Sequence, residues 1–356
     1  MLGAGKMSRK VMLLDLDEAQ LEELHIGWGQ PAYRARQLWG WIYGRLAEDF
    51  CSMTDLPQSL RDRLSQESSI HPLAAQAEWV STNGLTRKVL FELSDGETIE
   101  SVLMHHEGRH TACISVQVGC AFGCPFCATG RGGLVRNLSA GEIVGQVLFF
   151  ARLLARKGQR LSNVVVMGMG EPFANYQATW GALERLMDRR GFGLGARRIV
   201  ISTVGLIPGI RRLAAQNTQV RLAISLHAPT DDLRNRLVPL NRRYGLAQLL
   251  SACREYQSRT GRRISFEYLL ISGLNDSSLQ ARQLSHLLKG LQAHINLIPL
   301  NPIAEFPYSA SPPERIRAFR DELTRLGVSH TLRWSRGAQI QAGCGQLRSG
   351  QPIEPA

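Results

Sequence analysis

The sequence lacks any uninterrupted apolar run long enough to cross a bilayer, which needs about 20 residues. Its first apolar stretch, residues 11–14, is also too short for the hydrophobic part of a signal peptide, and acidic residues follow it directly. These absences exclude a membrane-embedded protein and argue against secretion. We therefore expect a protein of the cytoplasm.

Cysteines are few, and they lack the even count and spacing of a secreted disulfide framework. Three of the seven lie within residues 120–127, and no second closely spaced pair exists. An odd number with one tight cluster fits a reducing compartment in which thiols carry out metal or redox chemistry.

Acidic residues are scarce: 30 Asp and Glu stand against 42 Lys and Arg, which gives a formal net charge of +12. A basic protein attracts phosphate-bearing partners through long-range electrostatics. The sequence contains several arginine pairs, at residues 197–198, 211–212, 242–243 and 262–263. Their spread along the chain favours a nucleic-acid partner over a merely basic surface, without saying which nucleic acid.

The length of 356 residues allows one barrel-sized domain with a small appendage. Helical periodicity from residue 17 to about 71, with a helix start signal at Thr54 and Asp55, predicts a small helical module over residues 1–72. Two strand-like runs, residues 87–93 and 98–104, flank a turn at residues 94–96. We interpret residues 73–108 as a β-hairpin linker.

From residue 109 to 335, short β-rich runs alternate with helical stretches. The expected strands are residues 113–118, 163–168, 199–204, 220–226, 264–271 and 295–299. The expected helices are residues 142–157, 179–190, 206–216, 246–260, 277–289 and 312–326. This pattern predicts an α/β fold, a parallel partial (β/α)6 barrel whose site lies at the carboxyl ends of the strands. Residues 336–356 form a C-terminal tail.

The strongest chemical signal is the CxxxCxxC motif of Cys120, Cys124 and Cys127, directly after the first expected barrel strand. Three thiolates in a glycine-containing loop can hold three irons of a 4Fe-4S cluster and leave the fourth iron open. S-adenosylmethionine (SAM) can chelate an open iron, and an electron from the cluster can then cleave SAM to a 5′-deoxyadenosyl radical. The main alternative is a structural zinc site with His110 or His227 as fourth ligand, although zinc ligands usually come as two pairs.

Residues 167–172 end the second expected barrel strand with a glycine-rich motif. Its glycines, Gly168 and Gly170, let a ligand approach the backbone, and Glu171 can accept hydrogen bonds from a ligand ammonium group. A GxG motif alone is weak evidence and also fits a tight turn between a strand and a helix. Its place after the cysteine loop favours the functional interpretation.

The other cysteines divide into two kinds. Cys51 and Cys253 lie in helical stretches and are expected to be small core residues. Cys113 lies in the strand that leads into the cysteine loop. Cys344 is flanked by glycines, which are poor core material, so we expect a reactive thiol on a flexible tail.

With these motifs in view, the chain resembles the RlmN family, bacterial radical SAM methyltransferases that modify C2 of adenosine in 23S rRNA and in some tRNAs. The resemblance runs nearly end to end. It is carried by residues 31–43, 98–104, 118–130, 168–172, 225–228, 297–302 and 344–347. The combination of the motif with Cys113 and Cys344 is far more specific than CxxxCxxC alone.

The resemblance implies a role for each matching residue. Cys120, Cys124 and Cys127 are the expected cluster ligands. The expected SAM contacts are Gly170, Glu171, Ser202, Ser225, Leu226, His227 and Asn301. Cys344 is the expected methyl carrier, Cys113 its resolving partner in a transient disulfide, and Glu100 the proton acceptor.

The resemblance also implies partners and leaves alternatives open. It implies 23S rRNA and some tRNAs as substrates, a separate electron-donor protein, a monomer, and a helix-hairpin-helix-like N-terminal module that contacts phosphates. A Cfr-type enzyme that methylates C8 shares the cluster and both cysteines. A non-catalytic, zinc-stabilised RNA-binding protein is the alternative from another class. The tail departs from the family pattern, because Ala338 and Gln339 stand where acidic residues are common.

Overall fold

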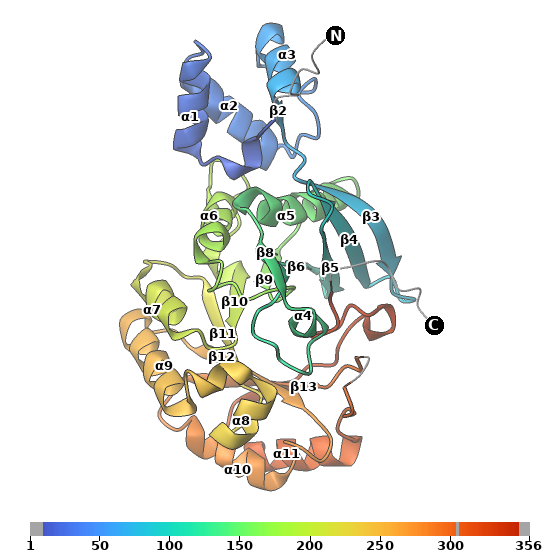
Figure 1. Ribbon diagram of the computed structural model, residues 1–356, viewed down its shortest axis with the longest axis vertical. Helices are drawn as coiled ribbons and strands as arrows, with labels where there is room; N and C mark the ends of the chain where they lie inside the picture. The colour runs from blue at the N-terminus through green and yellow to red at the C-terminus, as the bar shows by residue number, and fades with distance from the viewer. Residues whose placement is uncertain (1–9, 304–305, 349–356) are drawn as a thin grey trace, which may run out of the picture.

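The computed structural model describes residues 10–303 and 306–348. Figure 1 shows a small helical module at one end of the long axis and a curved sheet with surrounding helices in the rest of the molecule. No helix within these ranges is long and apolar enough to span a membrane.

The N-terminal module consists of three helices closed by a two-stranded parallel pair. The helices are α1 (Glu18–Gly27), α2 (Tyr33–Trp39), which continues as the π-helical turn η2 (Gly40–Gly44), and α3 (Gln58–Glu67); the pair is β1 (Val11–Met12) with β2 (Ser68–Ser69), and η1 (Leu13–Asp15) follows β1. Asp17 begins α1 with a capping box to Gln20. The predicted helix start at Thr54 and Asp55 is wrong, because α3 begins only after Pro57.

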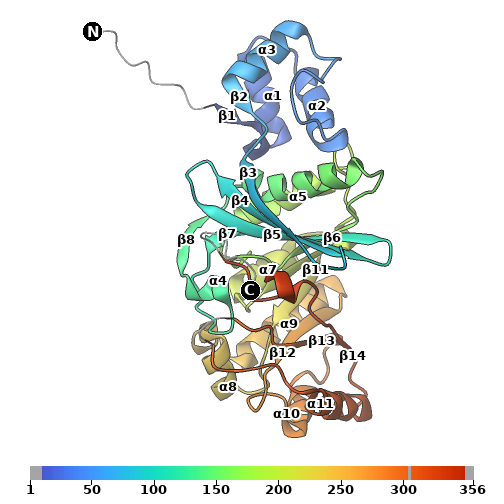
Figure 2. The same ribbon diagram turned by 90° about the vertical axis from the view of Figure 1, so that its right-hand side faces the viewer.

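Four antiparallel strands form one side of a ten-stranded sheet: β3 (Leu73–Val80), β4 (Thr86–Leu93), β5 (Thr98–His106) and β6 (Arg109–Cys113). Figure 2 shows them running beside α5 (Ala140–Ala155). The sequence predicted β4 and β5 as a linking hairpin; in the structure they are hydrogen-bonded into the main sheet. The strand β3 was not predicted, because its residues carry few of the β-branched side chains typical of strands.

The parallel part of the sheet begins at β6 and confirms the predicted partial (β/α)6 barrel. Its further strands are β9 (Asn163–Val166), β10 (Ile199–Thr203), β11 (Arg221–Ser225), β12 (Ile264–Leu270), β13 (Ala293–Pro299) and a short seventh, β14 (His330–Leu332). The connecting helices are α5, α6 (Tyr176–Met187), α7 (Ile207–Ala215), α9 (Leu246–Thr260), α10 (Ser278–Leu287) and α11 (Pro313–Arg325).

Several short elements were not predicted. They are α4 (Ala128–Arg131), α8 (Asp231–Leu237), the pair β7 (Gln117–Gly119) and β8 (Leu134–Asn137), and the 3-10 turns η3 (Ala196–Arg198), η4 (Pro239–Arg242) and η5 (Ala338–Ile340). The first barrel strand lies earlier than the predicted residues 113–118, at Arg109–Cys113. The chain then stays beside β9 and the segment after it, where the N–H of Val116 donates to the carbonyl of Met169, and forms the β7–β8 hairpin, which carries the cysteine loop.

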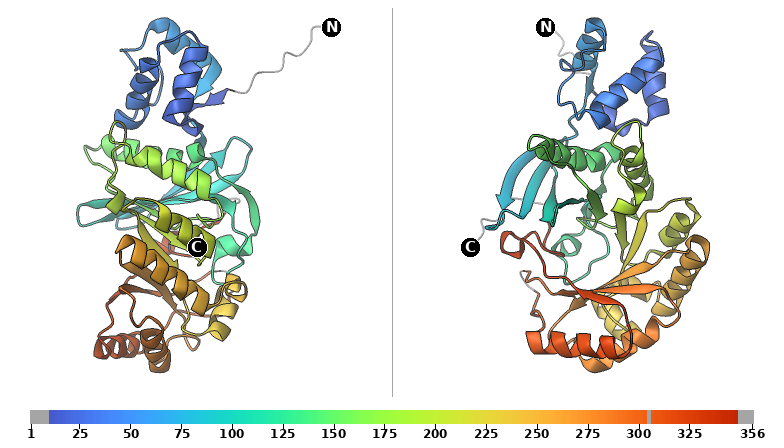
Figure 3. Two further views of the ribbon diagram at one scale, coloured as in Figure 1. Left: turned by 90° about the vertical axis from the view of Figure 1, so that its left-hand side faces the viewer. Right: turned by 180° about the vertical axis from the view of Figure 1, so that it is seen from behind.

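The helices lie on the outer side of the curved sheet, and the C-terminal segment crosses its inner side (Figure 3). On the outer side, Phe91 of β4 packs edge-on against Phe149 of α5, with ring centroids 5.0 Å apart. The apolar rows of the strands are therefore turned toward the helices. A second apolar cluster, which includes Phe126, Leu269 and Ile298, packs around Cys124 of the cysteine loop.

Candidate functional site

The cysteine loop is shaped by local backbone bonds. The N–H of Cys120 donates to the carbonyl of Gly133 at 2.7 Å, and the N–H of Cys127 donates to the carbonyl of Cys124 at 3.1 Å. Gly119 has φ +76°, and a Cβ there would stand 1.9 Å from the oxygen of Gly133. Only glycine fits this close approach, so the sequence itself closes the loop.

The three thiols of the loop lie close enough to influence one another. Burial raises the pKa of Cys120 to about 12, with a further contribution from Cys127. Burial also raises the pKa of Cys124 well above its ordinary value, and both neighbouring thiols add to this. A bound cationic group would reverse these shifts, because it stabilises thiolates.

The residues present fit a 4Fe-4S cluster. Three thiols converge from one loop, with Cys124 buried and Cys120 and Cys127 half-buried. Within the described ranges, no three His, Cys, Asp or Glu side chains are grouped for a single metal ion. A 4Fe-4S cubane does not need three ligands around one metal ion, because each thiolate binds a different iron. His110, considered for a zinc site, instead lies against His105, with 3.3 Å between their Nδ1 atoms.

One buried charge next to the loop was missed by the sequence analysis. Arg234 of α8 is 1% exposed, and its guanidinium donates to the carbonyls of Leu226 and Val204 and to the side chain of Asn241. Burial lowers the pKa of Arg234 to about 10, while Cys124 acts in the opposite direction. The side chain therefore places a positive charge near the thiols. Nothing in the local sequence distinguishes Arg234 from surface arginines.

The strand ends bring the expected SAM contacts to one side of the barrel. The hydroxyls of Ser202 and Ser225 lie 3.4 Å apart at the ends of β10 and β11. Leu226 and His227 follow β11 directly, and both backbone N–H groups donate to the carbonyl of Glu267. Gly170 and Glu171 follow β9, and Asn301 follows β13. This is the arrangement expected from a site at the carboxyl ends of parallel strands.

Glu171 and His227 are both buried and held by backbone groups. The Glu171 carboxylate accepts the N–H groups of Phe173 at 3.0 Å and Val204 at 2.8 Å. Burial raises its pKa to about 7, and these bonds oppose the rise. Nδ1 of His227 accepts the N–H of Leu269 at 3.2 Å, and burial lowers the pKa of His227 to about 3. The side chain of Thr203 also hydrogen-bonds to the carboxylate, so three neighbouring groups hold Glu171 in place.

Within its described residues, 336–348, the tail that the sequence predicted to be flexible is hydrogen-bonded across the inner side of the barrel. Asn301 donates its side-chain N–H to the carbonyl of Cys344 at 2.9 Å, and Ala128 donates its N–H to the carbonyl of Gly345 at 2.7 Å. Gln346 donates to the carbonyl of Pro302 at 2.9 Å. These bonds join the tail to α4 and to the end of β13. Its glycines permit close approach and do not make it loose.

Cys113 and Cys344 come close to each other although 230 residues separate them in the chain. Burial raises the pKa of Cys113 to about 12, and the nearby Cys344 raises it further. Cys344 is an exposed residue, yet burial of its thiol group raises the pKa to about 11, together with Glu267. All seven cysteines are free thiols in the structure.

Glu100 lies on the inner side of β5 and is 5% exposed. Its Oε1 is 2.7 Å from Nζ of Lys88, and its Oε2 accepts the backbone N–H of Arg348 at 3.0 Å. Burial raises the pKa of Glu100, whereas Lys88 and the tail lower it. The carboxylate is therefore an element of the inner wall that the tail covers.

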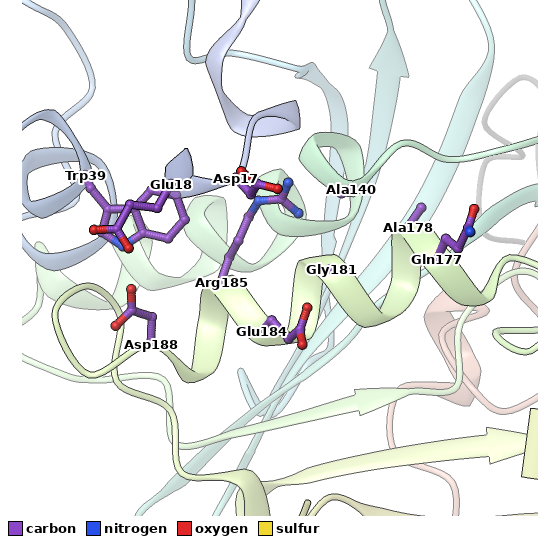
Figure 4. Close-up of a pocket in the computed structure, with 10 residues that line it drawn as sticks. All are labelled: Asp17, Glu18, Trp39, Ala140, Gln177, Ala178, Gly181, Glu184, Arg185 and Asp188. Atoms are coloured by element: carbon purple, nitrogen blue, oxygen red, sulfur yellow. The ribbon is translucent and has the colours of Figure 1, made fainter. Parts of the chain in front are cut away.

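A separate hollow of about 380 Å³, whose lining contains no cysteine, lies between the N-terminal module and α6 (Figure 4). Its lining includes Asp17, Glu18, Glu184 and Asp188, with Arg185 beside them. Acidic walls do not suit a phosphate backbone. The hollow contains none of the residues predicted for the site.

Two family models match the chain: the Radical SAM superfamily over residues 114–283, and the ribosomal RNA large subunit methyltransferase N-terminal domain over residues 11–70. A dual-specificity RNA methyltransferase RlmN 1 of Myxococcus xanthus is 48% identical, covering 95% of this chain and 94% of the relative. A probable dual-specificity RNA methyltransferase RlmN of Chloroflexus aurantiacus is 49% identical, covering 94% and 92%.

A solved structure is similarly close. The crystal structure of a radical SAM methyltransferase from Sphaerobacter thermophilus matches with a TM-score of 0.93 and 51% identity. The match covers 95% of this chain and 99% of that one. The similarity therefore extends beyond the barrel into the N-terminal module.

Proposed function

The chain belongs to the RlmN family of radical SAM RNA methyltransferases, and we propose that it methylates C2 of an adenosine in 23S rRNA, in the peptidyl-transferase region, and of the adenosine 3′ of the anticodon in some tRNAs. Its cofactors are a 4Fe-4S cluster and SAM. The reaction needs radical chemistry, because C2 of adenine is electron-poor and does not attack the methyl group of SAM. When bound, the cluster supplies the electron that cleaves SAM to a 5′-deoxyadenosyl radical.

One observation carries the proposal: the tail brings Cys344 beside Cys113 and the cysteine loop through bonds to α4 and Asn301. In the proposed reaction, the Cys344 thiol accepts a methyl group from one SAM. The methyl then loses a hydrogen atom to the 5′-deoxyadenosyl radical, and the resulting methylene carbon bonds to C2, which links protein and RNA. Glu100 accepts the C2 proton, and the one electron that remains returns to the cluster when it is bound. The Cys113 thiolate attacks the sulfur of Cys344 while the methylene carbon takes up a proton, so the methylated base is released and a disulfide remains for an external dithiol to reduce.

Cluster and SAM have separate residues in this proposal. Cys120, Cys124 and Cys127 hold the irons, and Arg234 offsets their negative charge. The SAM-binding wall consists of Gly170, Glu171, Ser202, Ser225, Leu226, His227 and Asn301. Asn301 thus has two tasks, because its amide also holds the carbonyl of Cys344. A cytoplasmic monomer, a separate electron-donor protein and phosphate contacts by the N-terminal module complete the proposal.

The test is mass spectrometry of digested RNA after anaerobic incubation with protein, SAM and a reductant. We expect 2-methyladenosine in 23S rRNA transcripts and in tRNA, and none with Cys344→Ala. A product methylated at C8 would replace the proposal by Cfr-type chemistry. A colourless preparation with zinc in place of iron, and no methylated product, would overturn it.

A further inference from the structure

The charged amine of Lys88 is buried on the inner side of the antiparallel strands. Leu90 of β4 lies opposite Glu100 of β5, so Lys88 stands one diagonal step from Glu100 on the same face. Its Nζ is 2.7 Å from Oε1 of Glu100, and the two side chains are 7% and 6% exposed. Two strands thus bring together a lysine and a carboxylate with almost no water around them.

A buried ion pair contributes little to the stability of a sheet. Removing two charges from water costs several kcal/mol per ion, and well-packed apolar side chains would serve as well or better. The wall nevertheless shields the ammonium further: the ring of Trp79, directly opposite Lys88 on β3, lies 4.6 Å from Nζ. Glu100 and Trp79 thus hold the Lys88 ammonium in one place, which indicates a role in the reaction.

The two oxygens of the Glu100 carboxylate have different partners. Oε1 is held by Lys88 and Oε2 accepts the N–H of Arg348, four residues beyond Cys344. The backbone of Glu100 is fixed as well, since its N–H donates to the sulfur of Met169 and its carbonyl accepts the hydroxyl of Ser115. One oxygen is therefore anchored to the sheet, and the other faces the segment that carries the substrate-linked cysteine.

We propose that Lys88 is a positioning residue, which keeps Glu100 ionised and oriented so that the oxygen facing the tail accepts the proton from C2. This inference rests on the proposed function. In the step concerned, the C2–H bond breaks, its electron pair stays in the base, and the proton goes to the Glu100 carboxylate. Lys88 keeps its own protons throughout.

The electrostatics give the reason why a base here needs a cation. Burial raises the pKa of Glu100, and Lys88 is the main group that opposes this rise. The charged groups that face the carboxylate are Lys88 from β4 and Arg348 from the tail. Without Lys88, the pKa of Glu100 would rise further, and a larger fraction of the carboxyl would be protonated and unable to accept another proton.

The experiment follows the decay of the covalent RNA–protein adduct on denaturing gels as a function of pH, with Lys88→Met, Lys88→Gln and Lys88→Arg. We expect Lys88→Met and Lys88→Gln to keep their iron, to methylate Cys344 and to form the adduct. At pH 7 the adduct should then decay at least about tenfold more slowly than in the unmodified protein. Relative to the unmodified protein at the same pH, the rate should recover by up to about tenfold per pH unit as Glu100 ionises. Lys88→Arg should restore most of the rate at pH 7.

Arg87→Met is the matched control, because Arg87 is the next residue on β4 and pairs with Glu78 instead. It should behave like the unmodified protein. A normal pH profile in Lys88→Gln, with adduct decay unchanged at pH 7, would overturn the inference. So would equal slowing at every pH, which indicates a purely structural role. If the unmodified protein makes no 2-methyladenosine, the proposed function fails first, and that outcome is read separately by mass spectrometry.

Discussion

The cysteine loop and the tail are both glycine-rich and meet on the inner side of the barrel, but they are held in different ways. The loop is closed by bonds between near neighbours, such as Cys127 to Cys124 and Cys120 to Gly133. The tail is held by partners far away in sequence, such as Asn301 and Ala128. Each such bond contributes about 1 kcal/mol net and can be released separately. The difference suits one set of thiols that stays fixed on irons and one thiol that must change partners.

The largest effect is expected when one cluster ligand is removed from the cysteine loop. Cys124→Ala should abolish the cluster and all SAM cleavage while the protein stays folded, because two thiolates do not hold the cubane. Iron content, visible absorbance and 5′-deoxyadenosine formation measure the effect. Cys51→Ala is the control and should keep full activity, because the prediction of Cys51 as a core residue is wrong and the residue is exposed in the N-terminal module. Retained iron and activity in Cys124→Ala would contradict the ligand assignment.

The next test separates the two cysteines that change partners. Cys344→Ala should form neither methylated RNA nor a covalent complex, because it has no thiol to carry the methyl group. Cys113→Ala should lose turnover but accumulate protein cross-linked to RNA, seen as a nuclease-sensitive shift on a denaturing gel. Structural cysteines would instead lower stability in both variants without a cross-link. No trapped adduct in a folded, cluster-containing Cys113→Ala would refute the resolving role.

A milder change loosens the tail without touching a thiol. Gln346→Ala loses two hydrogen bonds, one to the carbonyl of Pro302 and one from the N–H of Gly343, each 2.9 Å long. The docked tail should become less populated, and methylation should slow by about tenfold at unchanged iron content. Gln339→Ala, at an exposed position in the same tail, is the control. Equal rates in both variants would show that these bonds do not limit the reaction.

The smallest effect is expected for RNA binding by a residue outside the cysteine loop and the tail. Arg242→Ala removes an exposed charge and should weaken RNA binding several-fold at low salt, with the slope of affinity against salt reduced by about one. Binding titrations at several salt concentrations measure both. Arg211→Ala is the comparison, because Arg211 already pairs with Glu255 at 3.0 Å. If Arg242→Ala binds like the unmodified protein at low salt, Arg242 does not contact phosphate.

Much of the fold could be predicted from local patterns. Helices such as α9 and α11 have clear periodicity, and the apolar strands β10 to β13 lie between them. The strand β3 and the short β14 were missed, because both depend on a neighbouring strand more than on their own residues. The displaced first strand has the same cause, since residues 109–113 pair with β5 and β9, whereas residues 117–119 pair with β8.

The sequence by itself determined the cysteine loop. The spacing of Cys120, Cys124 and Cys127 and the glycine at position 119 act over a few residues, where the chain has little choice. It also determined the order of strands and helices, and hence the end of the barrel at which chemistry takes place.

The tertiary structure alone decided which distant residues act together. Lys88 meets Glu100 through strand register, Arg234 reaches Cys124 from an unpredicted helix, and the tail returns from the far end of the chain to cover them. Such contacts depend on how whole elements pack, and a buried charge is stable only where packing supplies its partner. A single sequence contains no local signal for that partner, so these pairings become visible only in the folded chain.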